Sequence, residues 1–96
     1  MNKQEIVAQL NKHLAEVAEL RKQNHTTAEF PRWRDKVLKT LQDIYGRESS
    51  QYSRFENAPG KSFKVNTELG MQQDYVFKLD CYESSLKTLL QRAEMG

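Results

Sequence analysis

The sequence predicts an all-α protein, a small antiparallel bundle of three to four helices with one longer loop at residues 57–67. Two observations predict this fold. Apolar residues recur at helical spacings of three and four residues in three separate stretches. Proline and glycine, which interrupt helices, fall together in the loop before the last stretch. A chain of 96 residues supports one modest core, so we expect a single domain over residues 1–96.

The first expected helix covers residues 3–23. Asn2, followed three residues later by Glu5, resembles a capping box and marks the start of this helix. Residues 22–27 carry no apolar side chain and predict a short turn after it. The apolar stripe consists of Ile6, Leu10, His13, Val17 and Leu20, widened by Val7 and Leu14.

The second expected helix covers residues 28–45 and ends at Gly46, a residue type that commonly terminates helices. Pro31 is tolerated only in a first helical turn, which moves the true start toward Phe30. Ser49 or Ser50 is expected to cap a short helical turn that carries Tyr52 and Phe55. The stripe of the second helix consists of Phe30, Trp33, Val37, Leu41 and Ile44, joined by Leu38 and Tyr45.

The last stretch has two interpretations. The spacing of Tyr75, Leu79, Tyr82, Leu86 and Leu89, extended by Leu90 and Ala93, predicts a helix. Alternation at Phe63–Val65 and at Tyr75–Leu79 would instead suit a two-stranded hairpin within residues 63–82. The helical pattern is the longer of the two, so we favour the helix. Trp33 is then expected to be buried beside Leu41, Leu86 and residues of the first helix.

Gly60-Lys61-Ser62 resembles the end of a phosphate-binding loop. Such a loop needs a further glycine five residues before Gly60, where backbone N–H groups turn toward the phosphates. Phe55 occupies that position, so we expect no nucleotide binding. His13, His25 and Cys81 are far apart in the sequence, which predicts neither a metal site nor a catalytic one. We expect no cofactor and no enzyme, and we interpret Cys81 as a small buried side chain.

Fifteen Lys and Arg residues against thirteen Asp and Glu leave a net charge of only +2. This is too small for a field that draws the whole molecule to nucleic acid. A local basic segment leaves open the alternative of a small nucleic-acid-binding regulator, although a solvated helix face is the commoner meaning of such a segment. The candidate contacts are Arg32, Arg34, Lys36, Lys39 and Arg47.

The location expected from the sequence is a reducing cytoplasm. A single cysteine cannot form an intrachain disulfide, and the N-terminus lacks the apolar stretch of a signal peptide. No apolar run approaches the ~18 residues that span a bilayer, so we expect no membrane insertion.

The stripe of the first helix is wider than two short partner helices are expected to cover. We therefore expect a homodimer in which the outer edge of the stripe of one copy meets that of the other, with His13 making the contact sensitive to acid. The function predicted from this pattern is a non-catalytic protein-interaction or adaptor module. The expected self-association residues are Ile6, Leu10, His13 and Val17.

Residues Glu29 to Ala58 carry a pattern of aromatic, apolar and small residues. In chain order it consists of Phe30, Trp33-Arg34, Val37, Leu41, Ile44, Tyr45-Gly46, Glu48-Ser49 and, at its end, Phe55. This pattern resembles a helical module that precedes predicted nucleotide-binding, TIR-like effector domains in bacterial defence and stress proteins. The resemblance covers about half of the chain. It implies a bacterial protein that works beside a fused or neighbouring effector. No residue of this chain matches the nucleotide site of such an effector, so no nucleotide-related activity is implied.

Overall fold

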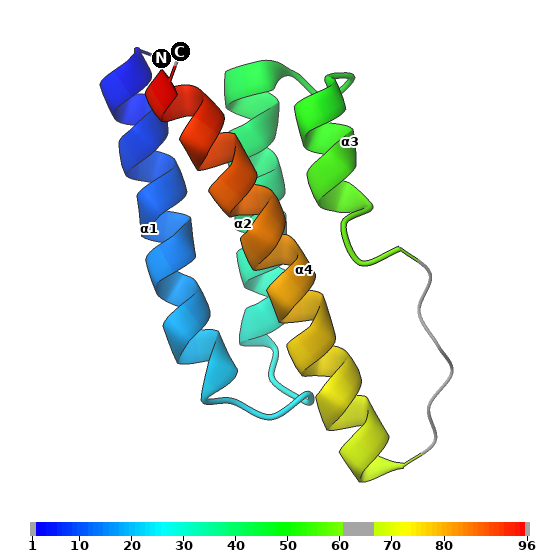
Figure 1. Ribbon diagram of the computed structural model, residues 1–96. Helices are drawn as coiled ribbons and strands as arrows, with labels where there is room; N and C mark the ends of the chain where they lie inside the picture. The colour runs from blue at the N-terminus through cyan, green and yellow to red at the C-terminus, as the bar shows by residue number, and fades with distance from the viewer. Residues whose placement is uncertain (1, 61–66, 96) are drawn as a thin grey trace.

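A computed structural model describes residues 2–60 and 67–95 of the chain. Four α-helices and no strand lie within these ranges (Figure 1). This confirms the predicted all-α bundle. The helices are α1 (Lys3–Arg21), α2 (Glu29–Tyr45), α3 (Ser50–Glu56) and α4 (Glu68–Met95).

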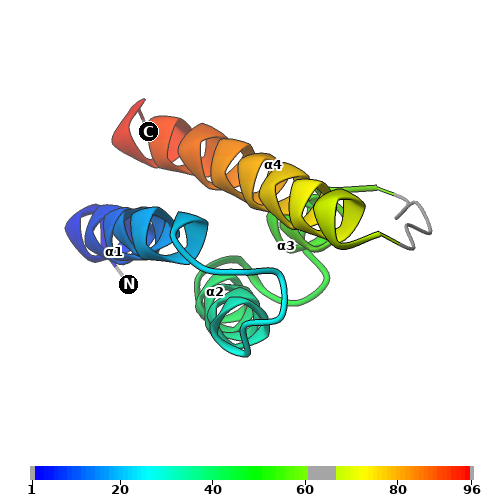
Figure 2. The same ribbon diagram turned by 90° about the horizontal axis from the view of Figure 1, so that it is seen from below.

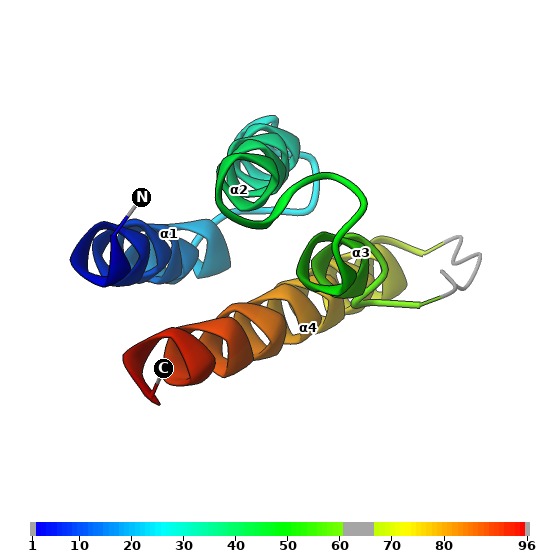
Figure 3. The same ribbon diagram turned by 90° about the horizontal axis from the view of Figure 1, so that it is seen from above.

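Successive helices run in opposite directions, so the first and last described residues lie at the same end of the bundle (Figure 1). Seen along its axis, the bundle has a helix at each corner of a distorted square (Figures 2 and 3). α1 packs against α2 and α4, and α3 packs against the same two helices. Within the described residues, no Cα atom of α2 comes within 8 Å of one in α4. These two helices therefore face each other across the diagonal.

Aromatic side chains fill the diagonal between α2 and α4. Phe30 meets Tyr75 edge to face with ring centroids 5.3 Å apart, and Trp33 meets Tyr82 in the same manner at 6.2 Å. Phe55 of the short α3 packs on Tyr82 at 4.8 Å. Large rings suit a place where backbones are too far apart for aliphatic side chains to meet. Trp33 lies in one buried cluster with Leu41, Leu86 and residues of α1, as predicted.

The sequence signals at Asn2, Gly46 and Ser49 mark helix ends in the structure, whereas α1 ends at Arg21 and not at the expected residue 23. The Asn2 side chain accepts a 2.9 Å hydrogen bond from the Glu5 N–H and donates one of 3.2 Å to the Glu5 carboxylate. Ser49 caps α3 by accepting a bond from the Tyr52 N–H at 3.1 Å. Gly46 ends α2 with φ +93° and ψ 150°, in a region that is essentially restricted to glycine.

The start of α2 combines a threonine and a proline. The Glu29 N–H donates to the Thr27 hydroxyl at 3.1 Å, although Thr27 lies one residue before the formal N-cap, Ala28. Pro31 is the third helical residue, a position whose missing N–H would have had no partner inside the helix. The helix therefore begins two residues before Pro31 rather than at Phe30.

α4 begins at Glu68. The preceding residue, Thr67, caps the helix, because its hydroxyl accepts a hydrogen bond from the Gly70 N–H at 3.1 Å. Residues 75–79 are helical, which excludes the second strand of the alternative hairpin. Phe63 and Val65, which would have formed its first strand, lie outside the described residues. In the helix, Tyr75 and Leu79 are buried whereas Phe77 is half exposed. The apparent alternation thus reflects two opposite sides of one helix.

The turn between α1 and α2 is attached to the first turns of α4. Gln72 accepts a 2.8 Å hydrogen bond from the His25 N–H and donates one of 3.3 Å to the Gln23 carbonyl. The Tyr75 hydroxyl donates to the Leu20 carbonyl at 2.5 Å. The Gln72 bonds satisfy main-chain groups of the turn, and the Leu20 carbonyl accepts the Tyr75 bond in addition to one from the Gln23 N–H. They hold α4 against α1 at this end of the bundle.

Candidate functional site

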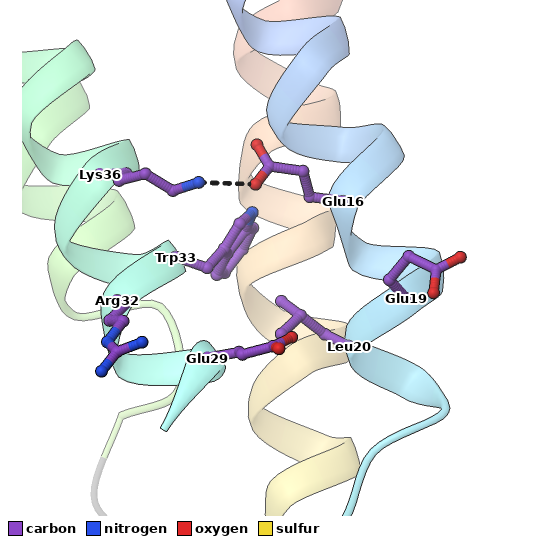
Figure 4. Close-up of a pocket in the computed structure, with 7 residues that line it drawn as sticks. All are labelled: Glu16, Glu19, Leu20, Glu29, Arg32, Trp33 and Lys36. Carbon is purple, nitrogen blue, oxygen red and sulfur yellow. Dashed lines mark hydrogen bonds and ion pairs between the residues drawn. The ribbon is translucent and has the colours of Figure 1, made fainter. Parts of the chain in front are cut away.

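A groove of about 300 Å³ lies between α1 and α2 (Figure 4). Its floor is Leu20 and Trp33, and the Trp33 ring is only 2% exposed. The indole N–H donates a 3.0 Å hydrogen bond to the His13 carbonyl. This bond satisfies the only polar atom of the Trp33 side chain. The ring is therefore held in place at the floor of the groove.

Charges of both signs surround this groove. Lys36 and Glu16 form a 2.8 Å ion pair across it (Figure 4). Burial alone would raise the pKa of Glu16, but hydrogen bonds from Lys36 and His13 outweigh that effect and leave the pKa below its ordinary value. Glu29 on the rim accepts a hydrogen bond from Gln23. The groove therefore presents charges of both signs, with Lys36 and Glu16 paired, instead of one sign to a ligand.

His13 is a buried link between α1 and α2. Its Nδ1 lies 3.2 Å from a Glu16 carboxylate oxygen, and its Nε2 lies 2.9 Å from the Thr40 hydroxyl. Burial lowers the pKa of His13 below 6.5, despite the neighbouring Glu16 carboxylate, which raises it. The imidazole is therefore neutral at neutral pH, with Nδ1 facing the Glu16 carboxylate and Nε2 facing the Thr40 hydroxyl, which itself lies 3.1 Å from the Lys36 carbonyl. This arrangement suits a structural role.

Three of the four expected self-association residues lie inside a single chain. Leu10 and Val17 are fully buried and His13 is 4% exposed, while Ile6 is half-buried and packs against the core. The stripe of α1 was expected to exceed what its partners cover. However, α4 is 28 residues long and packs against α1 extensively. The structure therefore assigns these three residues to the intrachain core and not to a surface between copies.

The structure separates the candidate nucleic-acid contacts. Arg32, Lys36 and Lys39 follow each other at spacings of four and three and share one side of α2. Arg34 lies on the opposite side, where it donates a 2.8 Å hydrogen bond to the Tyr82 hydroxyl and stacks over the Tyr82 ring. Arg47 follows the end of α2. Because Lys36 is paired with Glu16, only two cations of the shared face lack an acidic partner in the described part of the chain.

The loop after α3 lacks the geometry of a phosphate cradle where it is described. Phe55, at the position that would need glycine, is fully buried in α3. Gly60 has a positive φ of 67°. Lys61 and Ser62 lie outside the described residues, so the expectation about nucleotide binding stays a prediction.

Other chemically active groups do not converge. Across residues 2–60 and 67–95, no three His, Cys, Asp or Glu side chains are placed to hold one metal ion. Cys81 is half-buried, and burial raises the pKa of its thiol, with a smaller effect from Asp80. None of the helices, as far as the chain is described, is long and apolar enough to cross a bilayer.

An apolar strip lies on the first three turns of α4. Leu69 is 70% exposed and Phe77 is 50% exposed. Gln73, also exposed, stands between them at a spacing of four residues from each. In a helix these positions follow one another along one side, and that side points away from the buried Tyr75 and Leu79. We refer to Leu69, Gln73 and Phe77 as the α4 strip.

Comparison with known proteins found no match to this chain. Neither a family model, nor a curated protein, nor a solved structure matches the chain.

Proposed function

We propose that the chain is a non-catalytic interaction module that pairs with a second copy of itself through the α4 strip. The observation that carries this proposal is the exposure of Leu69 and Phe77. Within the described part of α4, Tyr75, Leu79, Tyr82, Leu86 and Leu89 are buried, and Met71 and Met95 are the other exposed large apolar residues. Exposed apolar side chains that gather on one side of a helix are typical of protein contact sites.

The strip is complementary to itself. An antiparallel pairing of two α4 helices about Gln73 places Leu69 of each copy opposite Phe77 of the other. It also places the two Gln73 amides together, and an amide group both donates and accepts hydrogen bonds. Such a twofold contact is closed, because each copy presents the same patch. A closed contact favours a dimer over an open chain of copies.

The size of the strip sets the strength of the pairing. A standard stable interface buries ~800 Å² on each partner, which is far more than one phenylalanine and one leucine supply. The expected dissociation constant is therefore on the order of 0.1 mM. Pairing of this strength responds to local concentration. It suits an adaptor that assembles only where several copies are brought together.

In its wider setting, the proposal is an adaptor of a bacterial defence or stress system. The support for this setting is the resemblance of residues 29–58 to helical modules that precede effector domains. A weakly pairing helical module would bring neighbouring effectors together by raising their effective concentration.

Sedimentation velocity between about 10 µM and 1 mM tests the pairing. The native chain should shift toward dimer as concentration rises, and Phe77→Glu should remain a monomer because the charge cannot enter an apolar contact. Ser84→Glu is the matched control, since Ser84 is exposed on the same side of α4 beyond the strip. Circular dichroism should show that both variants stay helical. A native chain that remains monomeric at 1 mM contradicts the proposal, as does equal loss of dimer in both variants.

The nucleic-acid alternative has weaker support, because the basic side of α2 is partly neutralised by Glu16. Contacts to phosphates release counterions and weaken steeply as salt rises. Titration of duplex DNA at low and at moderate salt should show no binding at moderate salt. Salt-sensitive binding that Arg32→Gln and Lys39→Gln each reduce would favour the alternative instead.

A further inference from the structure

A second hollow lies at the end of the bundle where the described chain begins and ends. It has a volume of about 380 Å³, toward the lower end of the ~300–1,000 Å³ typical of small-molecule sites. All four helices contribute to its wall. The lining residues are Lys3 and Ile6 of α1, Tyr45 of α2, Gln51 of α3, and Leu89, Arg92 and Ala93 of α4.

The wall of this end pocket is apolar. Ile6 and Ala93 are partly buried and pack against the core, and Leu89 is buried within it. The Tyr45 ring also packs on the core, and burial raises the pKa of its hydroxyl. An apolar wall open at one end of a bundle is suited to the tail of a small amphiphile.

Apart from the Gln51 amide, which both donates and accepts hydrogen bonds, the polar groups around the end pocket are two cations and the Tyr45 phenol. Lys3 and Arg92 line it, and no acidic residue does so among the described residues. Within the same part of the chain, neither cation forms an ion pair, in contrast to Lys36 in the α1–α2 groove. The Tyr45 hydroxyl, likewise, has no hydrogen-bond partner there. Two cations and a phenol around an apolar wall are complementary to one anionic head group.

We propose that the end pocket binds a small amphiphile with an apolar tail and a single carboxylate head. The tail contacts Ile6, Leu89 and Ala93, and the head lies between Lys3 and Arg92, within reach of the Tyr45 hydroxyl. This site is separate from the α4 strip, which occupies the opposite half of α4. The inference therefore does not depend on self-association.

Titration with sodium octanoate, followed by amide chemical shifts in ¹H–¹⁵N spectra, tests the site. Saturable shifts should centre on Ile6, Leu89 and Ala93. Octanol and octylammonium are the matched probes, because they keep the tail and change the head. Octanoate should bind more tightly than either. Equal affinity for octylammonium would overturn the charge argument, and shifts centred elsewhere would overturn the site.

Three variants of the pocket make the test specific. Lys3→Gln and Arg92→Gln should each weaken octanoate binding about two- to fivefold, the range expected for a solvent-exposed charge pair. Ala93→Phe should block binding by filling the hollow. Lys39→Gln is the control, an exposed lysine of α2 away from this pocket. Unchanged affinity in both charge variants would contradict the proposal.

The Phe77→Glu chain separates this inference from the proposed function. It should bind octanoate as the native chain does, whether or not the native chain forms a dimer. Loss of octanoate binding in this variant, with the helical content unchanged, would contradict the assignment of the ligand to the end pocket.

Discussion

The indole N–H of Trp33 donates a 3.0 Å hydrogen bond to the main-chain carbonyl of His13. The same histidine reaches Thr40 of α2 through its own ring, at 2.9 Å. His13 of α1 thus forms two hydrogen bonds with α2, one through its backbone carbonyl and one through its side chain. These two contacts fix how α1 and α2 pack, and the aromatic cluster around Trp33 depends on that packing.

Replacing Trp33 should destabilise the fold strongly. Trp33→Phe removes the hydrogen bond to His13 and leaves a smaller ring in a site that is 2% exposed. We expect a loss of about 2–4 kcal/mol in the free energy of unfolding, measured by urea denaturation. Phe77→Leu is the control, because Phe77 is half exposed, and should change stability by less than about 0.5 kcal/mol. Similar losses in the two variants would contradict the assigned core.

Protonation of His13 should oppose folding. Burial lowers its pKa from 6.5, with help from the nearby charges of Lys36 and Lys12 and against that of Glu16. The unfolded chain therefore takes up a proton at a higher pH than the folded chain. The free energy of unfolding should decrease as pH falls from about 6.5 toward the lowered pKa of the folded state, and this change should be absent above that range.

Urea denaturation at closely spaced pH values checks this dependence. His13→Gln should remove the slope due to His13, whereas His25→Gln leaves His13 in place and should keep it. Glu16 acts in a separate window. Because its pKa is lowered from 4.5, its contribution is present above that pH and is lost as pH falls through the pKa of the folded state. An unchanged slope between pH 6.5 and 5 in His13→Gln would refute the structural assignment.

A side chain at Gly46 should destabilise the fold through backbone conformation alone. A Cβ atom at this position would have nothing within 4 Å. However, φ +93° with ψ 150° lies in a region that costs other residues about 1–3 kcal/mol. We expect Gly46→Ala to lower the free energy of unfolding by that amount, measured by thermal or urea denaturation. Ser53→Ala, at an exposed position of α3, is the control. A smaller loss of stability in Gly46→Ala than in this control would contradict the positive φ of Gly46 between α2 and α3.

Local signals account for most of the fold. The Asn2 cap, Gly46 and the 4, 3 spacing each act within a few residues, so they can be interpreted without knowing the tertiary structure. The end of the loop at residue 67 was also predicted correctly. The first turns of α4 were not assigned from the pattern, because residues 68–74 contain only Leu69 and Met71 as large apolar residues. Their helix depends in part on contacts with the α1–α2 turn, such as the Gln72 bonds.

The surfaces were harder to predict, since they depend on what each helix leaves uncovered. His13 and its neighbours on α1 were expected at a surface because the length of α4 was not known. The sequence did contain a signal for the α4 strip. Phe77 departs from the 4, 3 spacing of Tyr75, Leu79 and Tyr82, and a helical projection places it on the far side. Similarly, the spacing of Arg34 separates it from Arg32 and Lys36, although its bond to Tyr82 requires the tertiary structure.

The most direct measurement of the central proposal is disulfide trapping at Gln73. In a Cys81→Ser background, Gln73→Cys places a single thiol next to the twofold axis of the proposed dimer, which passes between the two α4 helices at residue 73. Mild oxidation should produce a covalent dimer, detected by non-reducing electrophoresis. Ser84→Cys in the same background should produce far less, because the two thiols would lie about 33 Å apart along the paired helices at a rise of 1.5 Å per residue. Efficient trapping at residue 73 alone is the predicted result, and equal trapping at both positions or none at residue 73 would contradict self-association through the α4 strip.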